Sequence, residues 1–163
     1  MALTAILIIS GLAKKGAPRI IAIIFIIVFV LINIVSIDIA RPKAYDASRM
    51  AELSQMRAVL EYYYLDNEKY PGVPGSNQWN ILSNVLVEEY LGQLPNDHCN
   101  KTNPEWTYEY WVSTDGQKYV LKANLQSHSS TLNNKDGDLD GNIFGAFCGE
   151  DGPTEREYCI GNL

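Results

Sequence analysis

Three aspartates at alternate positions offer the clearest chemistry in this chain. Asp136, Asp138 and Asp140 lie in the segment NNKDGDLDGN and are followed directly by Gly141. Hard cations such as Ca²⁺ take six to eight oxygen ligands, and closely spaced carboxylates on a glycine-relaxed loop can supply them. Clustered carboxylates also repel one another unless a cation neutralises them. The segment therefore predicts a structural calcium site, with a solvated acidic turn as the alternative.

The segment begins like an EF-hand loop but does not continue like one. The six residues from Asp136 match the D-x-D-x-D-G start of that loop. Phe147 occupies the twelfth position, where an EF-hand has a bidentate glutamate. Because no helices are predicted on either side, we expect a calcium loop of another kind. Further oxygens could come from neighbouring polar residues: Asn133, Asn134 and Asp151.

The three cysteines indicate an oxidising compartment. Cys148 and Cys159 are close in sequence and form the simplest disulfide, which leaves Cys99 over. The other two pairings stay open, because spacing does not fix connectivity.

No catalytic set can be read from the sequence. His98 lies beside Cys99, but one histidine and one cysteine lack the other ligands of a zinc site. No nucleophile–base pair stands out either. We therefore expect a protein that is not an enzyme.

An apolar run near the N-terminus predicts a membrane anchor. From Ile20 to Ile37 the chain reads IIAIIFIIVFVLINIVSI, with only Asn33 and Ser36 as polar interruptions. Eighteen helical residues span about 27 Å, close to the hydrocarbon thickness of a bilayer. The sequence therefore predicts a transmembrane helix over 20–40.

Charge orients this anchor. Lys14, Lys15 and Arg19 precede the run, whereas the region from Ala44 onward has 8 Lys and Arg against 18 Asp and Glu, a net charge near −10. The positive-inside rule places the N-terminus in the cytoplasm and the acidic domain outside, as a single-pass membrane protein. The negative domain would repel nucleic acid.

The remaining sequence predicts an α+β domain. An amphipathic helix is expected over 44–71, with apolar residues at three- and four-residue spacings from Met50 to Tyr64. A shorter helix, capped by Ser76 or Asn77, is expected up to Tyr90. Aromatic and β-branched residues in 106–112 and 117–125, joined by STDG, predict a β-hairpin.

The predicted architecture is a long N-terminal helix packed on a small antiparallel sheet. The helix has a transmembrane half and an amphipathic half, and the Asn-, Asp- and Gly-rich region from Gln126 to Leu163 is expected to be a loop-rich tail. This divides the chain into a leader or cytoplasmic segment (1–19), a transmembrane helix (20–40) and an extracytoplasmic domain (41–163).

The order of these parts resembles the type IV pilin superfamily, and most closely the major pseudopilin of type II secretion systems. The matching motifs are D-N-x-x-Y-P at 66–71 and DGQKYVLKA at 115–123, preceded by the apolar helix and followed by the Asp-rich tail. The resemblance covers roughly 20–159. It implies a calcium-binding C-terminal loop, with Asp136, Asp138 and Asp140 as the ligands.

The resemblance also implies a structural function. Such subunits self-associate through their N-terminal helices into a pilus or pseudopilus filament, with the help of a secretion or pilus assembly machinery, and an extracellular location of the filament would follow. Gly16 resembles the leader cleavage site of the family, but Ile21 stands where the family has a glutamate. A membrane-tethered binding or accessory module that does not polymerise is therefore the alternative.

Overall fold

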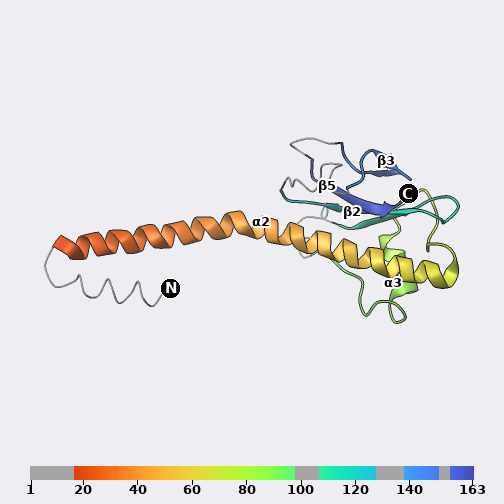
Figure 1. Cartoon of the computed structure of the whole chain (residues 1–163), viewed down its shortest axis with the longest axis horizontal. Helices are drawn as coiled ribbons and strands as arrows, with labels where there is room; N and C mark the ends of the chain where they lie inside the picture. Colours follow the sequence, from red (N-terminus) through yellow and green to blue (C-terminus); the bar gives the residue numbers. More distant parts are fainter. Residues whose placement is uncertain (1–16, 98–106, 128–137, 151–154) are drawn as a thin grey trace. The chain divides into compact units, whose positions relative to one another are not determined.

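The computed structural model describes residues 17–97, 107–127, 138–150 and 155–163, and for 17–19 and 33–39 it describes the backbone alone. The chain divides into two compact units, Met1–Pro42 and Lys43–Leu163. In chain order the elements are α2 (Ala17–Asn67), α3 (Trp79–Leu86), β1 (Glu109–Val112), β2 (Tyr119–Asn124), β3 (Asn142–Ile143), β4 (Ala146–Phe147) and β5 (Glu157–Asn162) (Figure 1).

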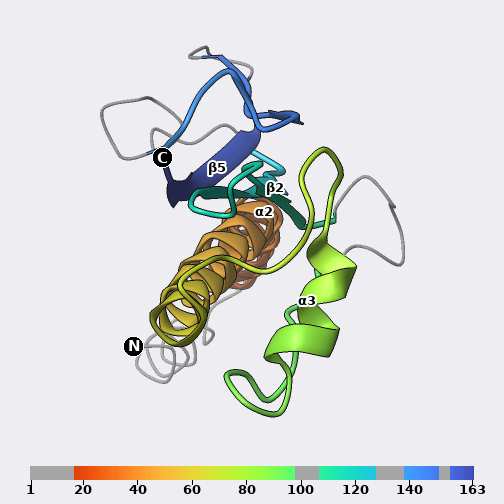
Figure 2. The same ribbon diagram turned by 90° about the vertical axis from the view of Figure 1, so that its right-hand side faces the viewer.

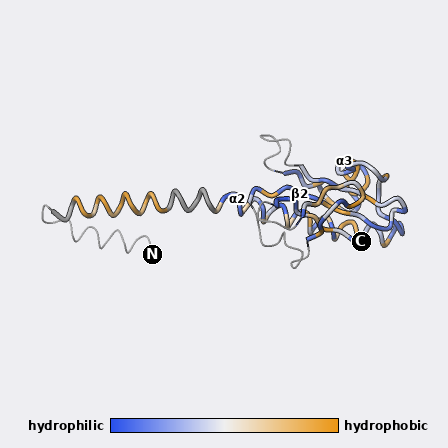
Figure 3. Tube along the Cα trace, turned by 90° about the horizontal axis from the view of Figure 1, so that it is seen from above, coloured by the Kyte–Doolittle hydropathy of each residue, from blue (hydrophilic) through white to orange (hydrophobic). Residues whose placement is uncertain are grey.

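The described part of the first unit is the beginning of α2. Helix α2 has 51 residues and continues through Pro42 without interruption. Between residues 20 and 32 every large apolar side chain is exposed, and this stretch is uniformly hydrophobic (Figure 3). Among the residues whose side chains are described, none of the helices combines the length and apolar character that a bilayer crossing requires. The transmembrane helix over 20–40 stays a prediction from the sequence.

In the second unit, α2 buries one apolar stripe. Leu53, Met56 and Leu60 are fully buried, and Met50 and Tyr63 pack at the edge of the same core. These positions recur every three or four residues, as the sequence predicted, because such spacing places side chains on one helix face. The second half of α2 therefore forms one side of the domain core.

An antiparallel sheet in the order β1-β2-β5 covers this stripe (Figure 2). The predicted hairpin is confirmed: β1 pairs with β2 from Glu109↔Lys122 to Val112↔Tyr119. Gly116 adopts a φ of +70° in the connecting turn, a conformation that glycine reaches without steric cost. The α+β class with a small antiparallel sheet agrees with the sequence analysis.

The C-terminal tail, expected to be loop-rich, contains more regular structure than the sequence indicated. Strand β5 pairs with β2 along its whole length, from Tyr119↔Asn162 to Asn124↔Glu157. A second, two-stranded sheet joins β3 to β4. The strands were overlooked because Asn, Asp and Gly dominate the composition around them, whereas the short run YCI within β5 is buried.

The sheet separates two apolar clusters. Alternation along a strand sends successive side chains to opposite faces. Tyr119 and Leu121 of β2 therefore join the large core with α2 and α3, whereas Val120 faces a small cluster with Ala146, Cys148 and Cys159. The described part of the Asp-rich segment, from Asp138 onward, lies on the side of this small cluster, since Leu139 packs against it.

A buried ion-pair network fixes the start of the domain part of α2. Arg49 is 2 % exposed and donates to Asp46 at 2.8 Å and to both carboxylate oxygens of Asp97. Asp46 also accepts the backbone N–H groups of Gln126 (2.7 Å) and Ser127 (3.0 Å) beyond β2. The network therefore joins α2 to two chain segments that are distant in sequence.

Tyrosines at the end of α2 and in the following turn belong to the core. The hydroxyls of Tyr70 and Tyr119 both donate to Glu61, at 3.0 and 3.1 Å. The backbone N–H of Tyr70 donates to the carbonyl of Gly116, and the carbonyl of Pro71 accepts the Tyr110 hydroxyl. The D-N-x-x-Y-P motif thus packs the end of the helix against the β1–β2 hairpin.

Candidate metal centre

Three acidic side chains from the C-terminal part of the chain meet in one cluster. Asp138, Asp140 and Glu155 each offer a carboxylate oxygen, and these oxygens all lie within 4.8 Å of one another. Asp138 and Asp140 belong to the predicted calcium loop. The third predicted ligand, Asp136, lies outside the described residues, as do Asn133, Asn134 and Asp151.

The backbone beside β5 positions Asp138. The N–H of Cys159 donates to Asp138 Oδ1 at 2.8 Å, and the N–H of Leu139 donates to the carbonyl of Cys159 at 3.0 Å. This pair of bonds holds the Asp-rich loop along β5. Asp138 itself is 3 % exposed, so its carboxylate is withdrawn from solvent.

Two glycines shape the rest of the cluster. Gly141 follows Asp140 with a φ of +88°, and its N–H donates to the carbonyl of Gly149 at 2.9 Å. Gly149 has a φ of +76°, and a Cβ there would lie 2.4 Å from Oε1 of Glu155. The absence of a side chain at residue 149 thus leaves room for the Glu155 carboxylate in its present position.

The cluster is electrostatically strained without a cation. Burial, together with the negative charges of Glu155 and Asp140, raises the pKa of Asp138 to about 7, against the lowering effect of the Cys159 N–H. Oδ2 of Asp138 has no hydrogen-bond partner among the described residues. A buried carboxylate oxygen of this kind is costly unless a cation or a donor satisfies it.

The donor set fits a hard divalent cation. All three clustered groups are carboxylates, and oxygen ligands suit Ca²⁺ or Mg²⁺ rather than the softer metals that cysteine and histidine select. Phe147, at the twelfth position from Asp136, lies in β4, and the residues after Gly141 form the short strands β3 and β4. The arrangement therefore differs from an EF-hand, as the sequence indicated.

Cys148 and Cys159 form a disulfide in the small cluster beneath the acidic residues, with a Cα–Cα distance of 5.7 Å. This is the pairing that the sequence analysis expected. Cys99 and His98, which it considered together, lie outside the described residues. Gly16, the possible cleavage position, lies outside them too.

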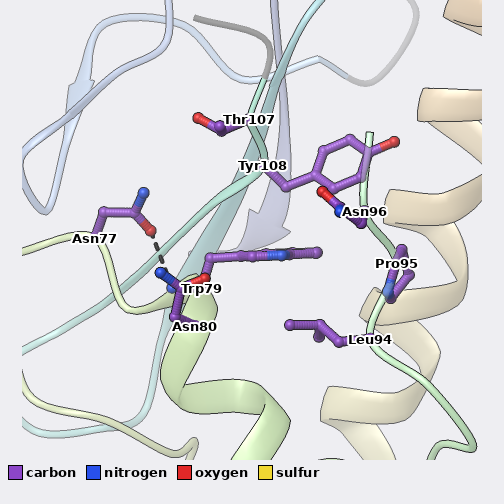
Figure 4. A pocket seen from close by; sticks show the side chains of 8 residues that line it. All are labelled: Asn77, Trp79, Asn80, Leu94, Pro95, Asn96, Thr107 and Tyr108. Carbon is purple, nitrogen blue, oxygen red and sulfur yellow. Dashed lines mark hydrogen bonds between the residues drawn. The ribbon is translucent and has the colours of Figure 1, made fainter. Parts of the chain in front are cut away.

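A polar cleft of about 430 Å³ lies between α3 and the start of β1 (Figure 4). Its described lining combines amide, hydroxyl, aromatic and aliphatic side chains: Asn77, Trp79, Asn80, Leu94, Pro95, Asn96, Thr107 and Tyr108. The rings of Trp79 and Tyr108 pack on each other with centroids 5.0 Å apart.

This cleft lies at a structural junction. Oδ1 of Asn77 accepts the N–H groups of Trp79 (3.0 Å) and Tyr110 (3.1 Å), which connects the start of α3 to β1. Asn77 thus does part of the capping expected of Ser76 or Asn77, although the N-cap position is Gln78, which makes no side-chain cap bond. Helix α3 ends at Leu86 and does not reach Tyr90.

Glu155 is the acidic residue that sequence reasoning missed. It lies 15 residues after Asp140, and no spacing rule connects the two. A usable signal was its place between Cys148 and Cys159, because a disulfide between them brings the intervening residues back toward the loop.

No family model matches the chain, and no curated protein or solved structure was found to be significantly similar to it.

Proposed function

We propose that this chain is a structural subunit of a type IV pilus-like or pseudopilus filament, assembled through its N-terminal helix and stabilised by calcium in its C-terminal loop. The observation that carries the proposal is the 51-residue helix α2. Its first part is apolar on every described side, and its second part supports a small sheet domain.

The first part of α2 exposes a continuous apolar surface. Twelve large apolar side chains between Ile20 and Ile32 are each at least 46 % exposed. A helix that is hydrophobic all round is normally enclosed, either by lipid or by other protein. A filament subunit uses both: lipid surrounds the helix before assembly, and neighbouring copies surround it afterwards through contacts that repeat without closing.

Side-chain shape distinguishes these two environments. Lipid chains adapt to a change of shape, whereas a packed protein interior retains a cavity that costs about 3–5 kcal/mol for a phenylalanine replaced by alanine. We expect the double replacement Phe25→Ala and Phe29→Ala to leave the chain in the membrane fraction but to reduce filaments strongly. The measurement is filament number and length by electron microscopy, beside membrane fractionation.

Leu65→Ala is the matched control, since Leu65 is 75 % exposed on the domain part of the same helix. We expect this variant to form filaments like the wild type. Normal filaments in the double variant would contradict assembly through the apolar part of α2.

The alternative is a membrane-tethered pilin-like module that does not polymerise. Ile21 favours it, because the glutamate that the family uses in assembly is missing there. Under this alternative the double variant would keep full function as long as it remained anchored.

Calcium is proposed as the ion held by Asp138, Asp140 and Glu155. The ion would neutralise three carboxylates that repel one another and would fasten the Asp-rich loop to β5. A ligand that binds only the folded state stabilises it by about 2.7 kcal/mol at a hundred times its Kd. We expect chelation to lower the melting temperature by several degrees.

The variant Asp138→Asn should change the melting temperature in opposite directions in chelator and in calcium. The amide keeps an oxygen for the Cys159 N–H but removes one negative charge from the cluster. In chelator the variant should therefore melt above the wild type, and in calcium it should melt below it. Glu89→Gln, which removes a charge at an exposed position, should leave the calcium response unchanged. A wild-type melting curve that does not respond to chelator would refute the site.

A further inference from the structure

The Cys148–Cys159 disulfide and the acidic cluster share their backbone. Cys159 donates its N–H to Asp138 Oδ1 at 2.8 Å and accepts the N–H of Leu139 at 3.0 Å. The residue that carries one half of the disulfide thus also orients the most buried carboxylate of the cluster. Any displacement of Cys159 along β5 moves Asp138 with it.

Cys148 has the same relation to the other side of the cluster. Its N–H donates to the carbonyl of Gly141, the residue that follows Asp140, at 2.8 Å. The next residue, Gly149, provides the space into which Glu155 reaches. All three carboxylates are therefore placed by segments that the disulfide joins.

Among the described residues, the regular structure between Asp140 and β5 is limited to two short strands. Strands β3 and β4 have two residues each, and they pair only with each other. The small apolar cluster beneath them consists of Val120, Ala146 and the two cysteines, with partly buried neighbours. Without the covalent link, mutual repulsion of the carboxylates would act directly on these weak contacts.

We propose that the oxidation state of the Cys148–Cys159 pair regulates calcium binding, so that the disulfide form binds the ion more tightly than the dithiol form. The proposal rests on the calcium site proposed above. The disulfide links two residues that are 11 positions apart in the sequence and so restrains the segment between them. This restraint holds the carboxylates close together before the ion binds. By linkage, calcium must favour the disulfide over the dithiol by the same factor.

The redox step is ordinary thiol–disulfide exchange with a dithiol reductant. One thiolate of the reductant attacks a cysteine sulfur and forms a mixed disulfide, which releases the other cysteine as a thiolate. The second thiol of the reductant then displaces the remaining cysteine. Two electrons and two protons pass to Cys148 and Cys159, and the reductant leaves as a cyclic disulfide.

The test compares the calcium affinity of the oxidised and the reduced full-length chain in detergent. Cys99→Ser is made first, so that only one cysteine pair reacts. We expect the Kd for Ca²⁺ by titration calorimetry to rise about tenfold or more on reduction, within the usual range of allosteric coupling. The double variant Cys148→Ser and Cys159→Ser should match the reduced chain. Near-ultraviolet circular dichroism reports whether the larger core stays folded.

Different failures give different results. Equal Kd values in the two states would overturn the coupling and leave the calcium site intact. A failure of the oxidised chain to bind Ca²⁺ would overturn both.

A second measurement covers the case in which the reduced chain loses its fold. The fraction of disulfide is measured at equilibrium in a dithiol redox buffer, with calcium and with chelator. Calcium should shift the exchange equilibrium constant toward the disulfide by tenfold or more in the Cys99→Ser chain. The shift should disappear when Asp138→Asn is added. An equilibrium constant that is independent of calcium would overturn the coupling, whether or not the reduced chain is folded.

Discussion

Replacement of Arg49 by alanine is expected to lower the free energy of unfolding of the domain by about 3–5 kcal/mol. The guanidinium forms ion pairs with the carboxylates of both Asp46 and Asp97, which are 3 % and 6 % exposed. Its removal leaves two buried negative charges near each other without their cation. The measurement is denaturant-induced unfolding of the full-length chain in detergent.

Arg57→Ala is the control, because Arg57 lies about two turns further along α2 and is exposed. Its unfolding free energy should stay within about 0.5 kcal/mol of the wild type. A loss of less than about 1 kcal/mol for Arg49→Ala would mean that the network does not hold the domain together.

Replacement of Gly161 by alanine is expected to destabilise the domain by at least about 3 kcal/mol, at the upper end of the cost of overpacking. Gly161 pairs with Val120 in the β2–β5 ladder. A Cβ at this position would lie 2.1 Å from the carbonyl oxygen of Tyr119 and 3.0 Å from the Cα of Val120. Both atoms belong to the backbone of the central strand, so no side chain can turn away to make room.

The loss of β5 pairing should be visible as early hydrogen exchange of the amides in 157–162. Gly92→Ala is the matched control, since a Cβ at that position would have no described atom within 4 Å and the φ of Gly92 is not in the left-handed region. That variant should remain within about 1 kcal/mol of the wild type. A Gly161→Ala chain as stable as the control would contradict the β2–β5 register.

Local patterns in the sequence were sufficient for the helix stripe and the hairpin. Leu53, Met56 and Leu60 recur at helical spacing, and the STDG turn joins two strands that are neighbours in the chain. Both features depend on contacts between residues that are close in sequence. The same holds for Asp138 and Asp140, which lie two residues apart.

Features that depend on distant segments were missed. Strand β5 pairs with a strand that ends more than 30 residues earlier, and Glu155 joins the aspartates through the disulfide. Arg49 and Asp97 are 48 residues apart. The sequence did contain one local sign of the Arg49 ion-pair network. Asp46 and Arg49 continue the helical spacing of the buried stripe toward its N-terminal end, so a charged pair occupies positions on the buried face of the helix.

The central claim is that copies of this chain assemble through α2. The most direct measurement is electron microscopy, combined with intact mass, of the protein isolated from its native membrane and culture medium. The account predicts filaments whose subunit has the mass of this chain, with or without its first 16 residues. A full-length chain found only as dispersed membrane particles, at concentrations where the folded domain is intact, would contradict it.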